Sequence, residues 1–478
     1  MNFLPRMLFL FMQILRSRSA QRDIKKMPMM IPVRGAAETG SAVKKNFDVW
    51  FSQIHRQQSL NIAPLPVMSS PPVTVLTKAT GIAAAAIVNA GSGYAAGDNL
   101  TPAGGECASA GRIRVLEVDD TGAIASVAVQ LPGVYSVTPA NPVTVTGGLG
   151  SGATFNLTWN AGVASSIYNG KTWSRTDTSL FQYTGYDIRD NVSGYRGNGV
   201  QNGTQCVIEF QSDAPVMDFR FVGGNGQYDL YVDGYRVSSE TVRTDTSGAP
   251  YIYTVDWRGV SVTRHYRLCG INTGFGGIIT GPDYIVSSPR GNKRPLAWQM
   301  GDSYTVGVGA NQGSFNDFHV MCDLLGIDGI ADGISGAGWG STQDGRVPEW
   351  RVRNKLGVIT QTPQFVFLSM GYNDAGGNIN TITNSFISAV QAVREVCALA
   401  KIFVIGPATP MGHTKQLDEI RAALMNQCEI LGLPFIDVRD IVNASNAEIY
   451  TGSDKTHPSD AGHLYRGVQI ALRVQECL

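Results

Sequence analysis

The stretch Leu296–Ser303, which reads LAWQMGDS, decides the fold of the C-terminal part of the chain. Its first five residues form an apolar run of strand length, and a glycine follows at once. Similar runs recur at residues 365–370, 402–405 and 435–438, with apolar residues at helical spacing between them. Because apolar strands that alternate with helices are typical of covered parallel sheets, residues 291–478 are predicted to form a three-layer α/β domain with a parallel sheet.

Three polar clusters lie where polar chemistry is expected in such a sheet, beyond the carboxyl ends of the strands. They are Gly301-Asp302-Ser303, Gly371-Tyr372-Asn373-Asp374 and Asp454-Lys455-Thr456-His457-Pro458. A serine becomes nucleophilic when an imidazole takes its proton, and a carboxylate orients that imidazole. Asp454 and His457 are three residues apart before a predicted helix, so both side chains can face the same way. The alternative is that Asp454 or Thr456 only caps that helix.

Together, these clusters resemble the sequence blocks of the SGNH (GDSL-type) hydrolase superfamily, over roughly residues 294–478. The resemblance implies a serine esterase with Ser303 as nucleophile, His457 as base and Asp454 as its orienting carboxylate. It implies an oxyanion hole made by the N–H groups of Ser303 and Gly336 and by the Asn373 side-chain amide. It implies neither a metal nor another cofactor, and His319, His413 and His463 are expected to be structural. One position departs from the family pattern, because Tyr304 stands where the family often has Leu.

The chain before residue 290 is predicted to consist of β modules joined by a linker. Residues 63–80 carry four prolines within residues 63–73 and are predicted to be that linker. Residues 81–160 are a glycine-rich β module with a hairpin signal around Asp119-Asp120-Thr121-Gly122. Residues 165–290 have regularly spaced, aromatic-rich strands, which are typical of a β-sandwich. Exposed aromatics such as Trp257 and Tyr235 could stack on sugars, although strand aromatics more often pack in a core.

Composition narrows the classes of partner and compartment. Lys plus Arg and Asp plus Glu both total 38, so no overall field recruits nucleic acid or an anionic membrane. Seven cysteines without C-x-x-C spacing indicate buried free thiols rather than a disulfide framework or zinc site. Residues 1–62 contain a predicted amphipathic helix at 40–60 and an apolar run, Leu8–Leu15, that is too short to span a membrane. This run fits either a signal peptide or sequence ahead of a true start at Met27 or Met29.

The segments Ala90–Asp98 (AGSGYAAGD) and Gly147–Leu157 (GGLGSGATFNL) resemble repeat modules of bacteriophage tail fibres and tailspikes. That resemblance implies an enzyme of the virion that removes O-acetyl groups from bacterial surface polysaccharide, either capsule or O-antigen. Residues 1–62 would then attach it to virion tail proteins, and a homotrimer would be the expected assembly.

Two alternatives remain open. One is a secreted or periplasmic bacterial carbohydrate or lipid esterase, and the other is an adhesive receptor-binding protein with an idle hydrolase fold. Tyr372 and Trp339 are expected to crowd the acyl side, which would favour acetyl esters. Residues of about 290–478 have the size of an ordinary domain and are expected to fold alone.

Overall fold

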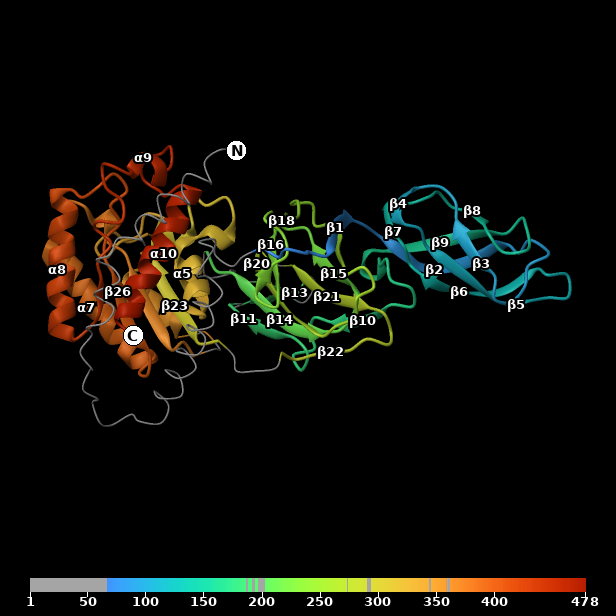
Figure 1. The fold of residues 1–478 in the computed structure, drawn as a ribbon, viewed down its shortest axis with the longest axis horizontal. Coiled ribbons are helices and arrows are strands. Elements are labelled where there is room, and N and C mark those ends of the chain that lie inside the picture. The colour runs from blue at the N-terminus through green and yellow to red at the C-terminus, as the bar shows by residue number, and fades with distance from the viewer. Residues whose placement is uncertain are drawn as a thin grey trace. The chain divides into compact units, whose positions relative to one another are not determined.

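The computed structural model describes residues 67–185, 188–190, 194–196, 203–272, 274–289, 294–343, 345–357, 359 and 362–478. The predicted helix at 40–60 and the apolar run Leu8–Leu15 lie outside the described residues. What is described is a mostly β region followed by a C-terminal α/β domain, as predicted (Figure 1).

A five-stranded parallel sheet forms the centre of the C-terminal domain, in the order β24-β23-β25-β26-β27. Four of these strands were predicted from their apolar runs, whereas β24, with the sequence DGIADG, has no such run. All residues of β23 and β24 are buried, because helices cover both faces. The strands are β23 (Leu296–Gly301), β24 (Asp328–Gly333), β25 (Phe365–Ser369), β26 (Lys401–Ile405) and β27 (Phe435–Ile436).

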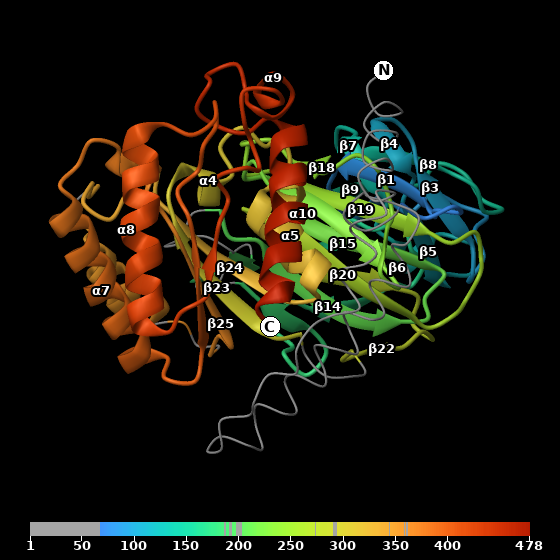
Figure 2. The ribbon, with the colours of Figure 1, turned by 60° about the vertical axis from the view of Figure 1, so that its left-hand side comes forward.

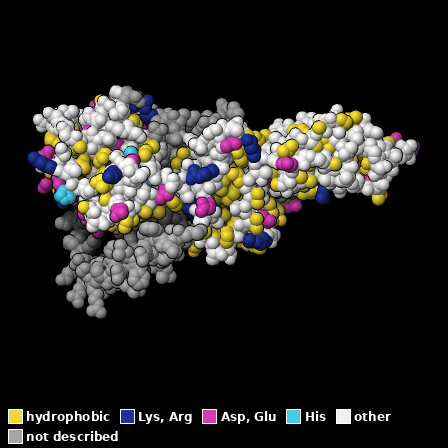
Figure 3. Space-filling view, turned by 90° about the horizontal axis from the view of Figure 1, so that it is seen from above, with side chains coloured by type: hydrophobic (Ala, Val, Ile, Leu, Met, Phe, Trp, Pro, Cys, Tyr) yellow, Lys and Arg dark blue, Asp and Glu magenta, His cyan; other side chains and the backbone are white. Residues whose placement is uncertain are grey.

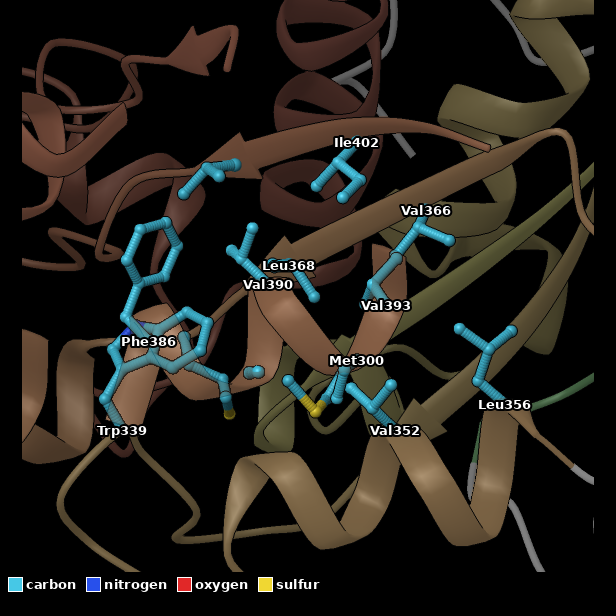
Figure 4. Close-up of a cluster of buried hydrophobic side chains, with 14 of the residues drawn as sticks. Met300, Trp339, Val352, Leu356, Val366, Leu368, Phe386, Val390, Val393 and Ile402 are labelled. Atoms are coloured by element: carbon cyan, nitrogen blue, oxygen red, sulfur yellow. The ribbon is translucent and has the colours of Figure 1, made fainter. Parts of the chain in front are cut away.

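Helices α7 (Ile379–Val396) and α8 (Lys415–Leu431) lie on one side of this sheet, and α5 (Asp317–Leu325) and α10 (Asp460–Glu476) on the other (Figure 2). On the α7 side, apolar side chains of the helix and of the strands form one buried cluster (Figure 4). The shorter elements are α4 (Ser303–Val306), η2 (Gly313–Phe315), α6 (Pro348–Arg351), η3 (Val352–Leu356), η4 (Tyr372–Asp374) and α9 (Ala447–Tyr450).

Two antiparallel sheets before this domain share one aromatic core and are called here the two-sheet region. Their orders are β1-β19-β15-β21-β10 and β11-β14-β20-β16-β17, with β18 beside β16 and β22 beside β14. Phe221 of one sheet stacks on Tyr228 of the other, with ring centroids 4.0 Å apart, as the packed faces of a sandwich require. The strands are β1 (Val73–Lys78), β10 (Lys171–Ser174), β11 (Gln182–Thr184), β14 (Cys206–Ser212), β15 (Val216–Val222), β16 (Gln227–Val232), β17 (Tyr235–Arg236), β18 (Val242–Arg243), β19 (Pro250–Asp256), β20 (Arg264–Ile271), β21 (Phe275–Thr280) and β22 (Val286–Ser287), while β12 (Ile188–Asp190) and β13 (Gly194–Arg196) pair with each other.

Strand β1 corrects the prediction that residues 63–80 are only a linker. All six of its residues pair with β19, at the edge of the first sheet. Residues 81–160 therefore lie between two strands of the two-sheet region in sequence, and we call them the inserted module. Its ends come together, because a Cβ added to Gly81 would lie 2.7 Å from the Cα of Ala164.

The inserted module is a six-stranded sheet of order β2-β9-β8-β3-β5-β6 with a separate β4-β7 pair. Its β5–β6 pairing confirms the predicted hairpin. The two glycine-rich segments lie side by side, since the backbones of Ser92 and Ser151 exchange hydrogen bonds of 3.1 and 3.0 Å. The elements are β2 (Gly81–Asn89), β3 (Asn99–Pro102), β4 (Glu106–Ser109), β5 (Arg112–Val118), β6 (Ile124–Leu131), β7 (Val134–Val137), β8 (Val143–Thr146) and β9 (Thr154–Asn160), followed by η1 (Ala161–Val163).

Several surface expectations can be compared with the structure. All seven cysteines are free, and five of them are buried as predicted, whereas Cys107 is exposed and Cys477 is half-buried. Trp257 is buried in the two-sheet core and donates to the Tyr266 hydroxyl, so it is not available to stack on sugars, whereas Tyr235 is exposed. On the face seen in Figure 3, acidic and basic side chains of the described residues are dispersed rather than gathered by sign. None of the helices in the described ranges is long and apolar enough to cross a membrane.

Candidate active site

Ser303 lies just beyond the carboxyl end of β23, the second strand of the sheet, and is the first residue of α4. The preceding Asp302 caps this helix, because its Oδ1 accepts a hydrogen bond of 2.9 Å from the Tyr304 N–H. Gly301 allows the turn, since a Cβ there would lie 1.9 Å from the Thr305 hydroxyl. The sequence GDS therefore forms a tight strand-to-helix turn that places the serine at the edge of the sheet, as the sequence suggested.

Buried charged side chains contact this turn. Burial raises the pKa of Asp302 to about 6, although its bond from Tyr304 and the charge of Arg466 oppose that shift. Arg351 is 1% exposed and donates 2.8 Å from Nη2 to the Gly301 carbonyl. Its Nε also pairs with Asp332 at 2.9 Å, so it joins the carboxyl ends of β23 and β24.

The predicted base and its carboxylate meet in the loop between α9 and α10. Asp454 Oδ2 and His457 Nδ1 are 2.6 Å apart, and Asp454 Oδ1 accepts from the backbone N–H of His457 at 2.9 Å. These backbone and ring hydrogen bonds from His457 lower the pKa of Asp454 to about 2, so it is ionised at neutral pH. The cap of α10 is Ser459, whose Oγ accepts from the Gly462 N–H. Asp454 therefore does not cap α10, and its contact with Nδ1 fixes the ring of His457 and leaves Nε2 without a bond to this carboxylate.

Two of the three proposed oxyanion-hole residues, Gly336 and Asn373, lie on loops that are joined by a hydrogen bond. Asn373 Nδ2 donates 2.9 Å to the carbonyl of Ala337, the neighbour of Gly336. Gly336 has a φ of +78°, a left-handed backbone that favours glycine. The Asn373 amide keeps a second N–H after this bond, so it can serve both the loop and an oxyanion.

Asp374 belongs to the third sequence block, but the sequence predicted no role for it. The structure shows that its side chain binds a backbone loop. Its buried carboxylate accepts three backbone hydrogen bonds, from Trp339 at 2.7 Å, Gly340 at 2.8 Å and Ser341 at 3.0 Å. It therefore fixes the loop that follows Gly336. An Asp next to Asn in the block was the available signal, but the loop it binds is more than thirty residues away in sequence.

The nucleophile and base blocks are joined indirectly. Among the hydrogen bonds of the described residues, none connects Ser303 Oγ with His457. Instead, the Tyr304 hydroxyl donates 2.5 Å to the carbonyl of Thr456, and the rings of Tyr304 and His457 have centroids 5.9 Å apart. Catalytic hydrogen bonds are often long in enzymes without substrate and tighten when it binds.

An open hollow of about 440 Å³ adjoins the base. Its walls come from the loop after α4 and from the loop that carries His457. The residues that line it are Gly309, Asn311, Gly452, Ser453, Asp454, His457, Pro458, Ser459, Asp460 and Ala461.

The other three histidines with an expected structural role, and Trp339, lie outside this hollow. His319 bonds to the Gly203 carbonyl and His463 to that of Val308, both buried, while His413 pairs with Asp418 at the surface. Trp339 is 1% exposed and packs edge-on against Phe386, so it belongs to the core and does not crowd the acyl side. In the described part of the chain, no group of three or more His, Cys, Asp or Glu side chains could hold a metal ion.

With this geometry established, comparison with known proteins shows what the domain is similar to. Residues 300–464 match the GDSL-like lipase/acylhydrolase family. A salicylyl-acyltransferase from a tetracycline biosynthetic pathway has a TM-score of 0.51 at 17% identity, over 64% of this chain and 97% of that one. An acetyl xylan esterase from the rumen bacterium Butyrivibrio proteoclasticus has a TM-score of 0.48 at 12% identity, over 64% of this chain and 98% of that one. The comparison with curated proteins found no match.

Proposed function

We propose that this carboxylic ester hydrolase, with its GDSL-like acylhydrolase domain at residues 300–464, removes O-acetyl groups from a bacterial surface polysaccharide. The observation that carries the proposal is the 2.6 Å contact between Asp454 and His457, in a loop tied to the Ser303 turn at the carboxyl edge of the sheet. A carboxylate–imidazole pair beside a serine at such a turn is the arrangement that acyl transfer requires.

In the proposed reaction, Ser303 Oγ attacks the acetyl carbonyl while His457 Nε2 accepts the hydroxyl proton. The N–H groups of Ser303 and Gly336 and the Asn373 amide hold the oxyanion that forms, and one such donor contributes about 2.7–4 kcal/mol. His457 then gives its proton to the departing sugar oxygen as the ester C–O bond breaks. Water, deprotonated by His457, finally releases acetate from Ser303.

The hollow beside His457 supports a sugar rather than a lipid as the leaving group. A leaving alcohol must lie next to the base that protonates it, and this hollow has the base in its wall. Asn311, Ser453 and Asp460 give it amide, hydroxyl and carboxylate groups, and it has no large apolar side chain. Such a lining suits a neutral polyhydroxy alcohol, which can hydrogen-bond to it, better than an acyl or alkyl chain.

The proposed preference for acetyl esters now depends on Tyr372 and the loop Gly333–Gly340, since Trp339 is in the core. Under the proposal, a series of aryl esters from acetyl to octanoyl is hydrolysed progressively more slowly. Faster turnover of the long chains would instead favour the lipid esterase alternative.

The proposal includes the tail of a bacteriophage as the place of action, with residues 1–62 as the attachment segment and a homotrimer as the assembly. Its support is the resemblance of the two glycine-rich segments, which the inserted module holds side by side. Detection of the chain in purified virions would agree with this location, and its recovery from bacterial culture medium without phage would favour a secreted enzyme.

The test of the activity is acetate release from a panel of acetylated capsules and O-antigens, with Ser303→Ala as the matched control. The wild type should deacetylate at least one polymer, and Ser303→Ala should lower turnover by several orders of magnitude, because covalent catalysis is lost. A Ser303→Ala variant that keeps more than about a tenth of the activity would disprove the assignment. Binding of polymer without any hydrolysis by the wild type would favour an adhesive protein.

A further inference from the structure

Tyr304 occupies the centre of the three sequence blocks that form the site. It follows Ser303 in the chain, and its side chain is only 4% exposed. Its ring centroid lies 6.2 Å from that of Tyr372, in the block of Asn373, and 5.9 Å from that of His457. The guanidinium carbon of Arg466 lies over the ring, 4.8 Å from its centroid, and Arg466 is itself paired with Asp317 at 3.0 Å. The ring is therefore held on several sides.

The hydroxyl of Tyr304 links the Ser303 turn to the loop that carries His457. It donates 2.5 Å to the carbonyl of Thr456, so the neighbour of the nucleophile is bonded to the neighbour of the base. Burial raises the pKa of this phenol well above its ordinary range, so the hydroxyl keeps its proton and remains a donor. The Tyr304 N–H is bonded to Asp302, which fixes the other end of the residue.

The loop that carries His457 has few other attachments. Its backbone bonds are internal, from Gly452 to the His457 carbonyl at 2.7 Å and from Lys455 to the Gly452 carbonyl at 3.0 Å. Asp454 likewise bonds only within the loop. Across the described ranges, the Tyr304–Thr456 bond is the one hydrogen bond that joins residues 452–457 to another part of the chain.

We propose that Tyr304 is a positioning residue, whose hydroxyl holds the His457 loop at the distance from Ser303 that proton transfer needs. It touches neither substrate nor reacting atoms and acts through the Thr456 carbonyl. This inference rests on the proposed roles of Ser303 and His457. It also gives a physical meaning to the Tyr at this position, because Leu has no group that could make the bond.

The test is Tyr304→Phe, which removes the hydroxyl and keeps the ring. Because a displacement of about 1 Å can cost about a hundredfold in rate, we expect kcat for an aryl acetate to fall roughly 10- to 100-fold, with KM changed less than about twofold. Labelling of Ser303 by a fluorophosphonate, which needs the base but no substrate pocket, should slow by a similar factor.

The matched control is Tyr183→Phe in the two-sheet region. Tyr183 is also buried at 4% exposure and also donates to a backbone carbonyl, that of Arg175, at 2.6 Å. This variant should lose a comparable amount of thermal stability and keep its kcat. If Tyr304→Phe changes kcat no more than Tyr183→Phe, the inference is overturned.

Two further variants distinguish the role of the hydroxyl from that of the ring, and the inference from the proposed function. Tyr304→Leu should reduce kcat as much as Tyr304→Phe, and a loss found only in the Leu variant would mean that ring packing, not the hydroxyl, holds the loop. Ser303→Ala separates the inference from the proposed function. An inactive Ser303→Ala beside a fully active Tyr304→Phe refutes only the inference, while activity in Ser303→Ala refutes both.

Discussion

The two β regions before the hydrolase domain have similar sequence patterns but different relations to it. Several contacts join the two-sheet region to the hydrolase, among them Arg267 to Asp328 at 2.7 Å, Thr204 Oγ1 to the Ala331 carbonyl at 2.5 Å, and His319 Nε2 to the Gly203 carbonyl at 2.7 Å. Among the described residues, no hydrogen bond or ion pair joins residues 81–160 to residues 294–478. The difference shows that a region without catalytic residues can still belong to the structural unit of the enzyme.

The structural similarity agrees with this division. The match with the salicylyl-acyltransferase covers 64% of this chain, which is more than the hydrolase domain alone contains. The shared fold therefore extends into the upstream β structure. The expectation that residues of about 290–478 fold alone has to be revised, because Asp328 would lose its buried partner.

Deletion gives the largest expected effect. A fragment of residues 294–478 should lose aryl acetate hydrolysis by more than about a hundredfold, because exposing its buried interface disturbs α4 and β24. Replacement of Gly81–Val163 by a short Gly-Ser linker should keep kcat/KM within about threefold, because the ends of the inserted module are adjacent. A folded fragment 294–478 with full activity would show that the two-sheet region, like the inserted module, is not needed for hydrolysis.

A single buried ion pair tests the same interface. Arg267→Ala leaves Asp328 in the interior without its ion-pair partner and Asp323 with only Arg294 at 3.6 Å, so the free energy of unfolding should fall by about 3–5 kcal/mol. The control is Lys78→Ala, whose pair with Asp245 is about half exposed on both sides, and it should cost at most about 1 kcal/mol. Urea unfolding measures both, and equal costs would contradict the buried role of Arg267.

Acid should weaken this interface through Glu209. Burial favours the neutral carboxyl, but His265, whose Nε2 lies 3.3 Å from Oε1, and the charges of Arg267 and Arg294 prevail and lower the pKa from 4.5 to about 2. The stabilisation from Glu209 is therefore complete above about pH 4.5 and is lost as the pH falls towards 2. Between these limits the loss should reach a few kcal/mol, measured by unfolding at a series of pH values. Glu209→Gln should flatten that dependence, and an unchanged slope would speak against the shift.

Alanine substitution of two glycines, one in each β region, is expected to give the smallest change in stability. Gly203 and Gly97 have φ values of +84° and +98°, so alanine costs about 1 kcal/mol of backbone strain at either position. At Gly203, in the two-sheet region, the new Cβ would also lie 2.4 Å from the Thr305 carbonyl of α4, whereas at Gly97 the nearest atom is 3.8 Å away. Gly203→Ala should therefore lower kcat as well as stability, and Gly97→Ala should lower stability alone. Equal kcat values in the two variants would place Gly203 outside the support of the nucleophile.

The features that the sequence predicted correctly depend on residues close together in the chain, and those that it missed depend on distant ones. The apolar run of β23, the hairpin β5–β6 and the Asp454–His457 pair depend on neighbours within a few residues, and the structure has all three. Strand β1 was missed because its partner β19 lies about 170 residues away and prolines precede it. The role of Asp374 and the burial of Trp339 were missed for the same reason, since each depends on a loop or helix distant in sequence.

The adjacent ends of the inserted module have a mechanical consequence. If residues before 67 were held while the enzyme engaged a surface, tension would first meet the bridge between Val67 and Arg236 and then the six paired residues of β1 and β19. The load could then cross into the two-sheet region there and bypass the strands of the inserted module. The strands of that module would be stretched only after β1 had separated from β19.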